Sequence, residues 1–271
     1  MSINGNRKEK HMTEKTDKLQ SILQEKGRLA VAYSGGIDSH FLLAAALRAL
    51  GKEQVLAVLC RGLMMPEAEV CEAERLLKDM GADYRILEVD VLAIPEFAEN
   101  DKRRCYFCKK HLMSRIKECA AENGFTAVAD GKNADDAGVY RPGAQAAEEI
   151  GIISPLFESG FTKQDIRTCA REWGISIWNK PSQACLASRF SYHTHLTAEK
   201  LQRVGEAEKI LHDAGFAACR VRVHDMIARI EVPREDMGRL VTLTGQIQKI
   251  RELGFSFVTL DLEGIRSGVF D

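Results

Sequence analysis

The chain has 271 residues, enough to bury the core of one large domain or two modest ones. Its 38 Lys and Arg residues balance 39 Asp and Glu residues, which excludes the bulk positive charge that attracts nucleic acid. No apolar run approaches the length of a membrane span, and the polar segment 1–18 lacks the apolar core of a signal peptide. We therefore expect a cytoplasmic protein with a disordered leader over 1–18 and no membrane or nucleic-acid partner.

Short apolar runs alternate with longer helical patterns in the first half of the chain. In chain order, the expected elements are a strand at 30–33, a helix at 41–50, a strand at 54–60, a helix at 67–80, a strand at 84–89, a helix at 107–123 and a strand at 126–129. This alternation predicts an α/β fold built on a doubly wound parallel sheet. Ligands of such sheets bind beyond the carboxyl ends of the strands.

The second half begins with capping-box spacing at Thr162 and Asp165, which predicts a helix that runs to Trp173. The pattern changes at about residue 191. The expected elements of this half are a strand at 175–178, a helix at 198–214, strands at 218–223 and 227–232, a helix at 234–253 and a strand at 256–260. We therefore predict a main domain at 19–190 and a smaller α+β domain at 191–271, which would serve substrate binding or oligomerisation.

The loop Ser34–Ser39 reads Ser-Gly-Gly-Ile-Asp-Ser and joins the first strand to the first helix of the sheet. Two adjacent glycines let backbone N–H groups converge on one point, where the helix dipole favours an anion. The loop lacks the Gly-Lys-Ser/Thr ending of a Walker A motif. It resembles instead the PP-loop of ATP pyrophosphatases, which split ATP into AMP and pyrophosphate. The alternative is an ordinary turn between a strand and a helix.

The resemblance implies that this loop holds the pyrophosphate of ATP. The expected ATP-binding residues are Ser34, Gly35, Gly36, Asp38, Ser39, Gly131 and Asp135. Asp38 is the candidate Mg²⁺ contact because hard cations take oxygen ligands, and its alternative role is a first-turn carboxylate that the helix dipole stabilises. Gly131 and Asp135 follow the fourth strand, where the aspartate either closes the nucleotide site or caps a turn.

Eight cysteines in a cytosolic chain argue against a disulfide framework and favour metal or catalytic use where they cluster. Cys105 and Cys108 stand three residues apart at the start of a helix, and Cys185 is a distant third. Three thiolates suit an iron–sulfur cubane with one open iron better than a structural zinc site, which takes four ligands. The alternative is a redox pair and a separate thiol. The other cysteines are expected to be packing residues: Cys60, Cys71, Cys119, Cys169 and Cys219.

Several motifs together resemble the LarE family. They are the Ser34–Ser39 loop, the Cys-Tyr-Phe-Cys-Lys run within 100–109, the Ala-Cys-Leu-Ala-Ser-Arg run at 184–189, and the Arg-Val-Arg strand at 220–222 followed by 228–232. The resemblance implies an ATP-dependent sulfur transferase of nickel-pincer nucleotide synthesis. Such an enzyme adenylates the carboxylates of a pyridinium biscarboxylate mononucleotide, releases pyrophosphate and forms thiocarboxylates.

The family resemblance implies two possible sources of sulfur. In one, the cysteine that matches Cys185 gives up its own sulfur and becomes dehydroalanine. In the other, three cysteines hold a [4Fe–4S] cluster that carries an extra sulfide. Cysteine stands at all three matching positions, Cys105, Cys108 and Cys185, which favours the cluster and leaves sacrifice of Cys185 open. The implied cofactors are ATP, Mg²⁺ and a [4Fe–4S] cluster, and the sulfide donor is unknown.

Basic residues are the candidates for substrate binding. Arg220 and Arg222 alternate on a strand and so face the same side, where paired guanidinium groups suit a phosphate. Arg189 and Lys109 flank the cysteines and would orient the substrate. Glu208 matches a family carboxylate near the site. The alternatives are a solvated strand face for the two strand arginines and exposed charges for the others.

A tRNA thiolation enzyme is the nearest rival, because such enzymes also combine a PP-loop with three cysteines. The balanced charge and the absence of an added basic RNA-binding domain argue against it. An amidating ligase would need an ammonia source. A nucleotide sensor or an iron–sulfur carrier would bind ATP or a cluster without releasing pyrophosphate. We expect a homo-oligomer whose substrate is a small mononucleotide.

Overall fold

The computed structural model describes residues 3–137, 142–181 and 184–266, and the chain forms two compact units. The first unit comprises Met1–Arg61, Val70–Val89 and Cys105–Ser182. The second comprises Gly62–Glu69, Asp90–Arg104 and Gln183–Asp271, so it takes in two short segments from earlier in the chain. No helix among the described residues is both long and apolar enough to cross a membrane.

The first unit is built on a parallel sheet with the strand order β3-β2-β1-β4. Its strands are β1 (Leu29–Tyr33), β2 (Val55–Arg61), β3 (Asp83–Glu88) and β4 (Ala127–Ala129). Every residue of β1 is buried, as expected for a central strand that is covered on both faces. This sheet confirms the predicted doubly wound α/β fold.

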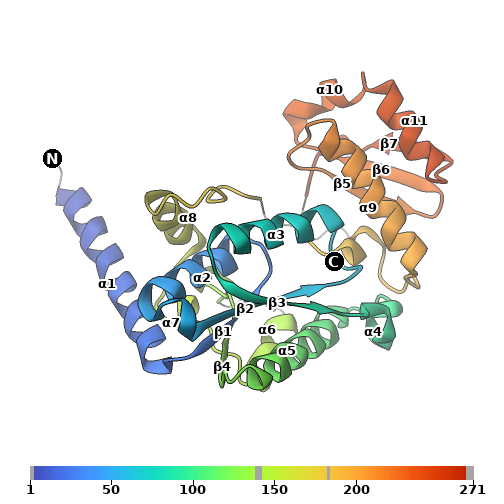
Figure 1. Ribbon diagram of the computed structural model, residues 1–271. Coiled ribbons are helices and arrows are strands. Elements are labelled where there is room, and N and C mark those ends of the chain that lie inside the picture. The colour runs from blue at the N-terminus through green and yellow to red at the C-terminus, as the bar shows by residue number, and fades with distance from the viewer. Residues whose placement is uncertain (1–2, 138–141, 182–183, 267–271) are drawn as a thin grey trace. The chain divides into compact units, whose positions relative to one another are not determined.

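Helices cover both faces of this sheet. Figure 1 shows α2 and α3 on one face and α5 and α6 on the other. The helices of the unit are α1 (Ile3–Lys26), α2 (Ile37–Leu50), α3 (Glu67–Asp79), α5 (Arg104–Glu122), α6 (Pro142–Glu149), α7 (Pro155–Glu158) and α8 (Lys163–Glu172). The first residues of α3 and α5, up to Glu69 and Arg104, belong to the second unit. The expected capping box opens α8: Thr162 and Asp165 each accept a hydrogen bond from the other's backbone N–H.

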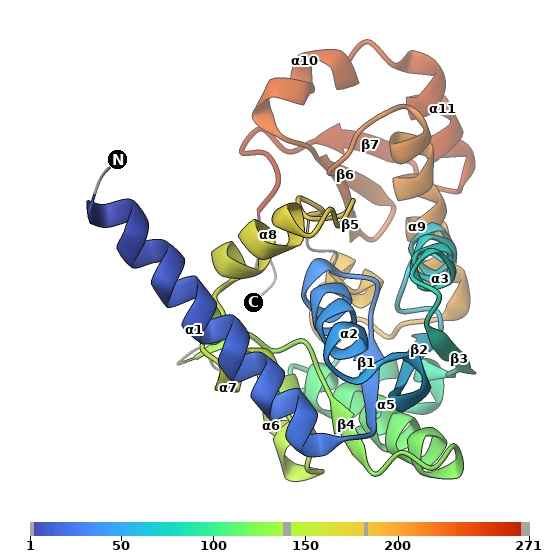
Figure 2. The same ribbon diagram turned by 60° about the vertical axis from the view of Figure 1, so that its left-hand side comes forward.

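The N-terminal segment differs from the expectation of a disordered leader. Helix α1 begins at Ile3 and packs alongside α2 and α7 (Figure 2). Leu19 and Leu23 are fully buried, and Lys15 makes a 2.6 Å ion pair with Asp165. The apolar residues of the second half of α1 thus anchor a helix that extends back through the polar segment.

The second unit contains a small mixed sheet, in agreement with the smaller α+β domain that the sequence predicts. Strand β5 (Arg220–His224) pairs antiparallel with β6 (Ile227–Glu231), which pairs parallel with β7 (Phe257–Leu260). Helix α9 (Ala198–Asp213) packs against β5 and buries Leu201, Val204 and Leu211. The remaining helices are α4 (Pro95–Ala98), α10 (Met237–Leu240) and α11 (Thr244–Glu252).

Two predicted elements are wrong. Residues 175–178 form turns instead of a strand, because Trp178 N–H and Lys180 N–H donate back to the carbonyls of Ile175 and Ile177. The single helix expected at 234–253 is divided into a 3₁₀ turn, α10 and α11. The break falls where Thr242 Oγ1 donates to the Arg239 carbonyl, a local bond that competes with helix continuation.

Candidate functional site

The Ser34–Ser39 loop of the first unit is held together by hydroxyl groups. Ser39 Oγ donates to the Gly36 carbonyl at 3.0 Å, accepts from Ser34 N–H at 3.2 Å and lies 3.1 Å from Ser34 Oγ. Gly35 has a φ of +73°, a left-handed conformation that glycine adopts without strain. Gly36 stands at the N-cap of α2, and no side chain caps that helix. The first N–H groups of α2 are therefore suited to bind an anion.

A buried hydrogen bond joins the two ends of this loop. Tyr33 Oη lies 2.9 Å from His40 Nδ1, so the last residue of β1 is tied to the first turn of α2. Burial lowers the pKa of His40 to about 4 and raises the pKa of Tyr33. Both side chains are therefore neutral at physiological pH, and the bond needs no counterion.

Gly131, which follows β4, lies directly against the loop. A Cβ at this position would stand 2.8 Å from Ser39 N and 3.1 Å from the Asp38 carbonyl carbon. Neither neighbour is the flexible end of a side chain. Gly131 is therefore required where the backbone after β4 meets the first turn of α2, and its expected contact with ATP stays a prediction.

We predict that Gly131→Ala weakens ATP binding by about tenfold or more, because the methyl group displaces the loop whose donors must converge on phosphate. Calorimetric titration with ATP measures the change. Gly245→Ala is the matched control, since a Cβ there meets nothing within 4 Å. Equal ATP affinity in the Gly131 variant and the wild-type protein would contradict this interpretation of the contact.

Asp38 lies in the first turn of α2 and pairs with Lys163 at the start of α8. The distance between Lys163 Nζ and Asp38 Oδ2 is 2.5 Å, and Lys163 N–H donates to Asp135 Oδ2 at 2.8 Å. Asp38 Oδ1 is buried and has no hydrogen-bond partner among the described residues. Burial raises the pKa of Asp38, while the hydrogen bond and charge of Lys163 oppose that rise. One carboxylate oxygen thus remains available to a cation.

The turn after β4 also holds the other acidic candidates. Asn133 and Asp136 form a capping box, with Asp135 between them in a single 3₁₀ turn. Asp130 Oδ1 accepts from Ser154 Oγ at 2.8 Å, and Asp130 Oδ2 lies 3.6 Å from Lys109 Nζ. Lys109 is therefore half-buried and paired within the first unit, and is not an exposed helix charge.

The two clustered cysteines stand in the first two turns of α5. Cys105 is exposed and Cys108 is buried. Their spacing of three residues brings them to one side of the helix. No group of three or more Cys, His, Asp or Glu side chains in the described ranges is arranged to hold a metal ion.

Cys185 belongs to the second unit, where it is half-buried and immediately precedes a 3₁₀ turn over Leu186–Arg189. Its carbonyl accepts from Ser188 N–H at 2.9 Å and from Ser188 Oγ at 2.7 Å. Leu186 N–H donates to the Met64 carbonyl and fixes the start of the turn. The cysteine therefore sits on a backbone that hydrogen bonds hold from two directions.

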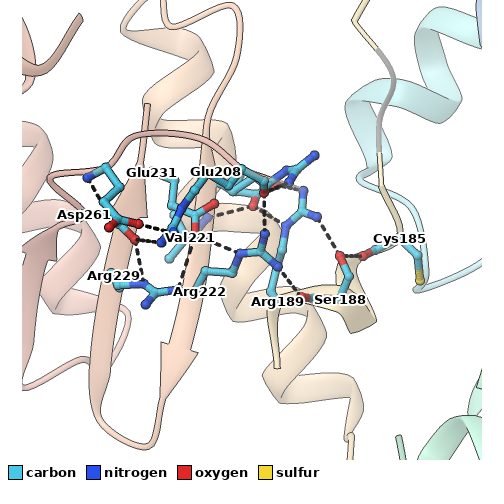
Figure 3. A network of polar contacts seen from close by, with 12 residues as sticks. Cys185, Ser188, Arg189, Glu208, Val221, Arg222, Arg229, Glu231 and Asp261 are labelled. Atoms are coloured by element: carbon cyan, nitrogen blue, oxygen red, sulfur yellow. Dashed lines mark hydrogen bonds and ion pairs between the residues drawn. The ribbon is translucent and has the colours of Figure 1, made fainter. Parts of the chain in front are cut away.

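Ser188 connects this turn to a network of arginines and carboxylates (Figure 3). Arg189 is buried and makes a bidentate pair with Glu208 of α9, at 2.7 Å from Nε to Oε1 and 3.0 Å from Nη2 to Oε2. Arg189 Nη1 donates to Ser188 Oγ, and Glu208 also accepts from Val221 N–H at 2.9 Å. Neither Arg189 nor Glu208 is an exposed charge. Burial lowers the pKa of Arg189, but Glu208 outweighs it and raises the value overall.

Arg222 lies at the centre of the same network. Its Nη1 donates to the Ser188 carbonyl at 2.7 Å, and its Nε lies 3.1 Å from Glu231 Oε1. Arg229, opposite Arg222 in the register of β5 and β6, shares this carboxylate and also reaches Asp261 at 3.5 Å. The buried side chain of Arg222 is therefore neutralised within the protein.

Arg220 differs from its neighbours because no carboxylate of the described chain forms an ion pair with it. It is half-buried and donates to the Arg266 carbonyl, which Arg222 also contacts, so both strand arginines face the same side as predicted. Burial lowers the pKa of Arg220, and the charges of Arg189 and Arg222 lower it further. Arg220 thus carries the uncompensated positive charge of the network, a feature suited to an anionic ligand.

The remaining cysteines follow the packing expectation with one exception. Cys60, Cys119, Cys169 and Cys219 are buried, and burial raises the pKa of both Cys60 and Cys169 to about 11. Cys71 is exposed on α3, so its prediction as a packing residue is wrong. Position 71 lies between the buried residues Val70 and Ala73, on the side of α3 that faces away from them.

Sequence reasoning missed the residues that complete these sites. Lys163 and Asp130 were not singled out, although each contacts a predicted residue of the first unit, and neither was Ser154, which donates to Asp130. In the second unit, the family motifs contain Ser188, Arg229 and Glu231, but no role was predicted for these residues from the sequence. The alternation of Arg229 and Glu231 on β6 was visible in the sequence, but nothing in it placed them opposite Arg222.

Comparisons with known proteins agree with this fold. The model of the NAD synthase family matches residues 11–123. A protein of Lactiplantibacillus plantarum named pyridinium-3,5-bisthiocarboxylic acid mononucleotide synthase is 39% identical over 251 residues, which covers 92% of this chain and 91% of the relative. Uncharacterised proteins of Synechocystis and Methanocaldococcus jannaschii are 38% identical over 257 residues and 31% identical over 254 residues, and each alignment covers 96% of the relative.

The sheet, the glycine loop and these matches define an ATP-dependent, adenylating enzyme of the PP-loop class. The class contains several families, and the similarity to the Lactiplantibacillus synthase extends over nearly the whole of both chains. The chain belongs to the LarE family.

Proposed function

We propose that this protein is a sulfur transferase that adenylates the carboxylates of pyridinium-3,5-biscarboxylic acid mononucleotide and converts them to thiocarboxylates for nickel-pincer nucleotide synthesis. The name of the Lactiplantibacillus relative supports this substrate class. The observation that carries the proposal is the shared network of Cys185 and the arginines. Ser188 binds the Cys185 carbonyl, Arg189 and Arg222, so a thiol and a group of cations are fixed to one another.

The first unit would activate the substrate. A carboxylate oxygen attacks the α-phosphorus of ATP, pyrophosphate leaves, and the product is an acyl adenylate. Ser34, Ser39 and the uncapped N-terminus of α2 supply donors for the departing pyrophosphate. Asp38 fits the Mg²⁺ that ATP brings, because its buried Oδ1 lacks a partner. Bound Mg²⁺ would add positive charge where the phosphates gain negative charge.

The second unit would bind the phosphate of the mononucleotide. Arg220 supplies the unpaired guanidinium, while Arg189 and Arg222 are held in place by Glu208 and Glu231. Sulfur then attacks the acyl carbon and AMP leaves, so one C–S bond forms as one C–O bond breaks. Lys109 and Asp135 are proposed to orient the substrate and close the nucleotide site.

The source of sulfur follows from the three cysteines. We favour a [4Fe–4S] cluster held by Cys105, Cys108 and Cys185, which when bound would supply a sulfide from its open iron. Two of these thiols stand three residues apart at the start of α5, a spacing common among cluster ligands. Donation of the Cys185 sulfur itself is the alternative, which needs only one cysteine.

Iron and acid-labile sulfide, counted in protein purified without oxygen, test the cluster. We expect about four irons per chain in the wild-type protein and their loss in Cys105→Ala. Cys71→Ala is the matched control, because Cys71 is an exposed thiol on another helix. Iron-free wild-type protein after anaerobic reconstitution would contradict the cluster. Pyrophosphate release that depends on the mononucleotide tests the activation step separately.

A further inference from the structure

Arg104 is a buried cation whose hydrogen-bonding capacity is partly unmet. It is the first residue of α5 and immediately precedes Cys105 in the chain, yet only 6% of its surface is exposed. Its Nε and Nη1 are buried and have no hydrogen-bond partner in any described part of the chain. Its guanidinium lies over the ring of Tyr192, 4.6 Å from the centroid. The ring face offsets part of the positive charge, but it offers no acceptor atom in the plane of the guanidinium, so these N–H groups form no hydrogen bond with it.

The backbone around Arg104 is held firmly within the second unit. Asn100 Nδ2 donates to the carbonyls of Phe190 and Ser191, and His193 N–H donates to the Asn100 carbonyl. Asn100 is fully buried with a φ of +51°, and its Oδ1 also lacks a partner. Two buried polar side chains within five residues therefore end in unsatisfied atoms. Such atoms in native proteins commonly await a ligand or water.

We propose that Arg104 binds a carboxylate of the substrate and so selects for carboxylated pyridinium mononucleotides. This inference rests on the proposed function. The substrate would bring one phosphate and two carboxylates, and Arg220 already provides an unpaired cation for the phosphate. A carboxylate supplies the in-plane acceptor oxygens that Tyr192 cannot. Arg104 is thus a specificity-determining residue next in sequence to one of the cluster cysteines.

Two ligands that differ at one group test the assignment: nicotinate mononucleotide, which carries a carboxylate, and nicotinamide mononucleotide, which carries a neutral amide. We expect Arg104→Met to weaken binding of the nicotinate form by about 10- to 100-fold in calorimetric titration. Affinity for the amide form and for ATP should stay unchanged. Arg103→Met, at an exposed arginine one residue earlier, is the matched control and should bind both ligands as the wild-type protein does.

Thermal unfolding of the ligand-free protein separates this role from a structural one. If Arg104 awaits an anion, methionine removes an unsatisfied buried charge, and the Tm should stay the same or rise. A marked fall in Tm with equal losses for both mononucleotides would overturn the proposal, since it would show that Arg104 serves packing. Undiminished nicotinate binding by Arg104→Met would overturn it as well. A wild-type protein that binds no pyridinium mononucleotide would refute the proposed function and this inference with it.

Discussion

Replacing Cys185 with serine is expected to lower the rate of thiocarboxylate formation by at least about a thousandfold, while pyrophosphate release continues. Adenylation of the substrate would require the ATP loop of the first unit, and Cys185 is not part of this loop. Both routes of sulfur supply need this thiol, one as a cluster ligand and the other as the donor. Mass spectrometry of the product and an enzymatic pyrophosphate assay measure the two steps separately.

The wild-type protein after turnover then distinguishes the routes. Sacrifice of Cys185 would leave the chain lighter by one H₂S and stop the reaction after a single sulfur transfer. A cluster that carries sulfide would leave the mass of the chain unchanged and permit further turnovers. Cys71→Ser is the control for the loss of a thiol as such. Undiminished thiocarboxylate formation by Cys185→Ser would contradict its role in both routes.

The central sheet could be predicted because short apolar runs in the sequence mark its strands. The run Leu29–Tyr33 is apolar throughout, Ser34 and a glycine pair follow it, and every residue in it is buried. The short strand expected at 175–178 failed because its apolar residues lie in a tight turn after Gly174, where only Ile177 is buried. A pattern of four residues cannot distinguish a strand from a turn that buries one side chain.

The candidate site could be predicted only where its residues are close in sequence. The loop Ser34–Ser39 and the pair Cys105 and Cys108 were visible as motifs. Lys163 was not, because its partner Asp38 is 125 residues away and its own position is that of an ordinary first helical residue. The same holds for Arg104, whose unmet hydrogen bonds exist only in the folded chain.

Glu208→Gln is expected to destabilise the protein by about 3–5 kcal/mol, because it leaves the guanidinium of Arg189 buried without its counterion. The side chains of the pair are only 1% and 2% exposed, so water cannot replace the lost charge. Glutamine keeps an acceptor for Val221 N–H, so the loss would arise from the charge itself. Denaturant unfolding monitored by circular dichroism measures the change.

Glu206→Gln is the matched control, because Glu206 is exposed on the same helix. This substitution should change the free energy of unfolding by less than about 0.5 kcal/mol.

The double variant Arg189→Met, Glu208→Leu removes both charges and should recover most of the lost stability. It should not recover catalysis, because Arg189 also holds Ser188, and through it the turn that carries Cys185. A double variant that is stable and inactive would show that this buried pair serves the position of the thiol more than the stability of the fold.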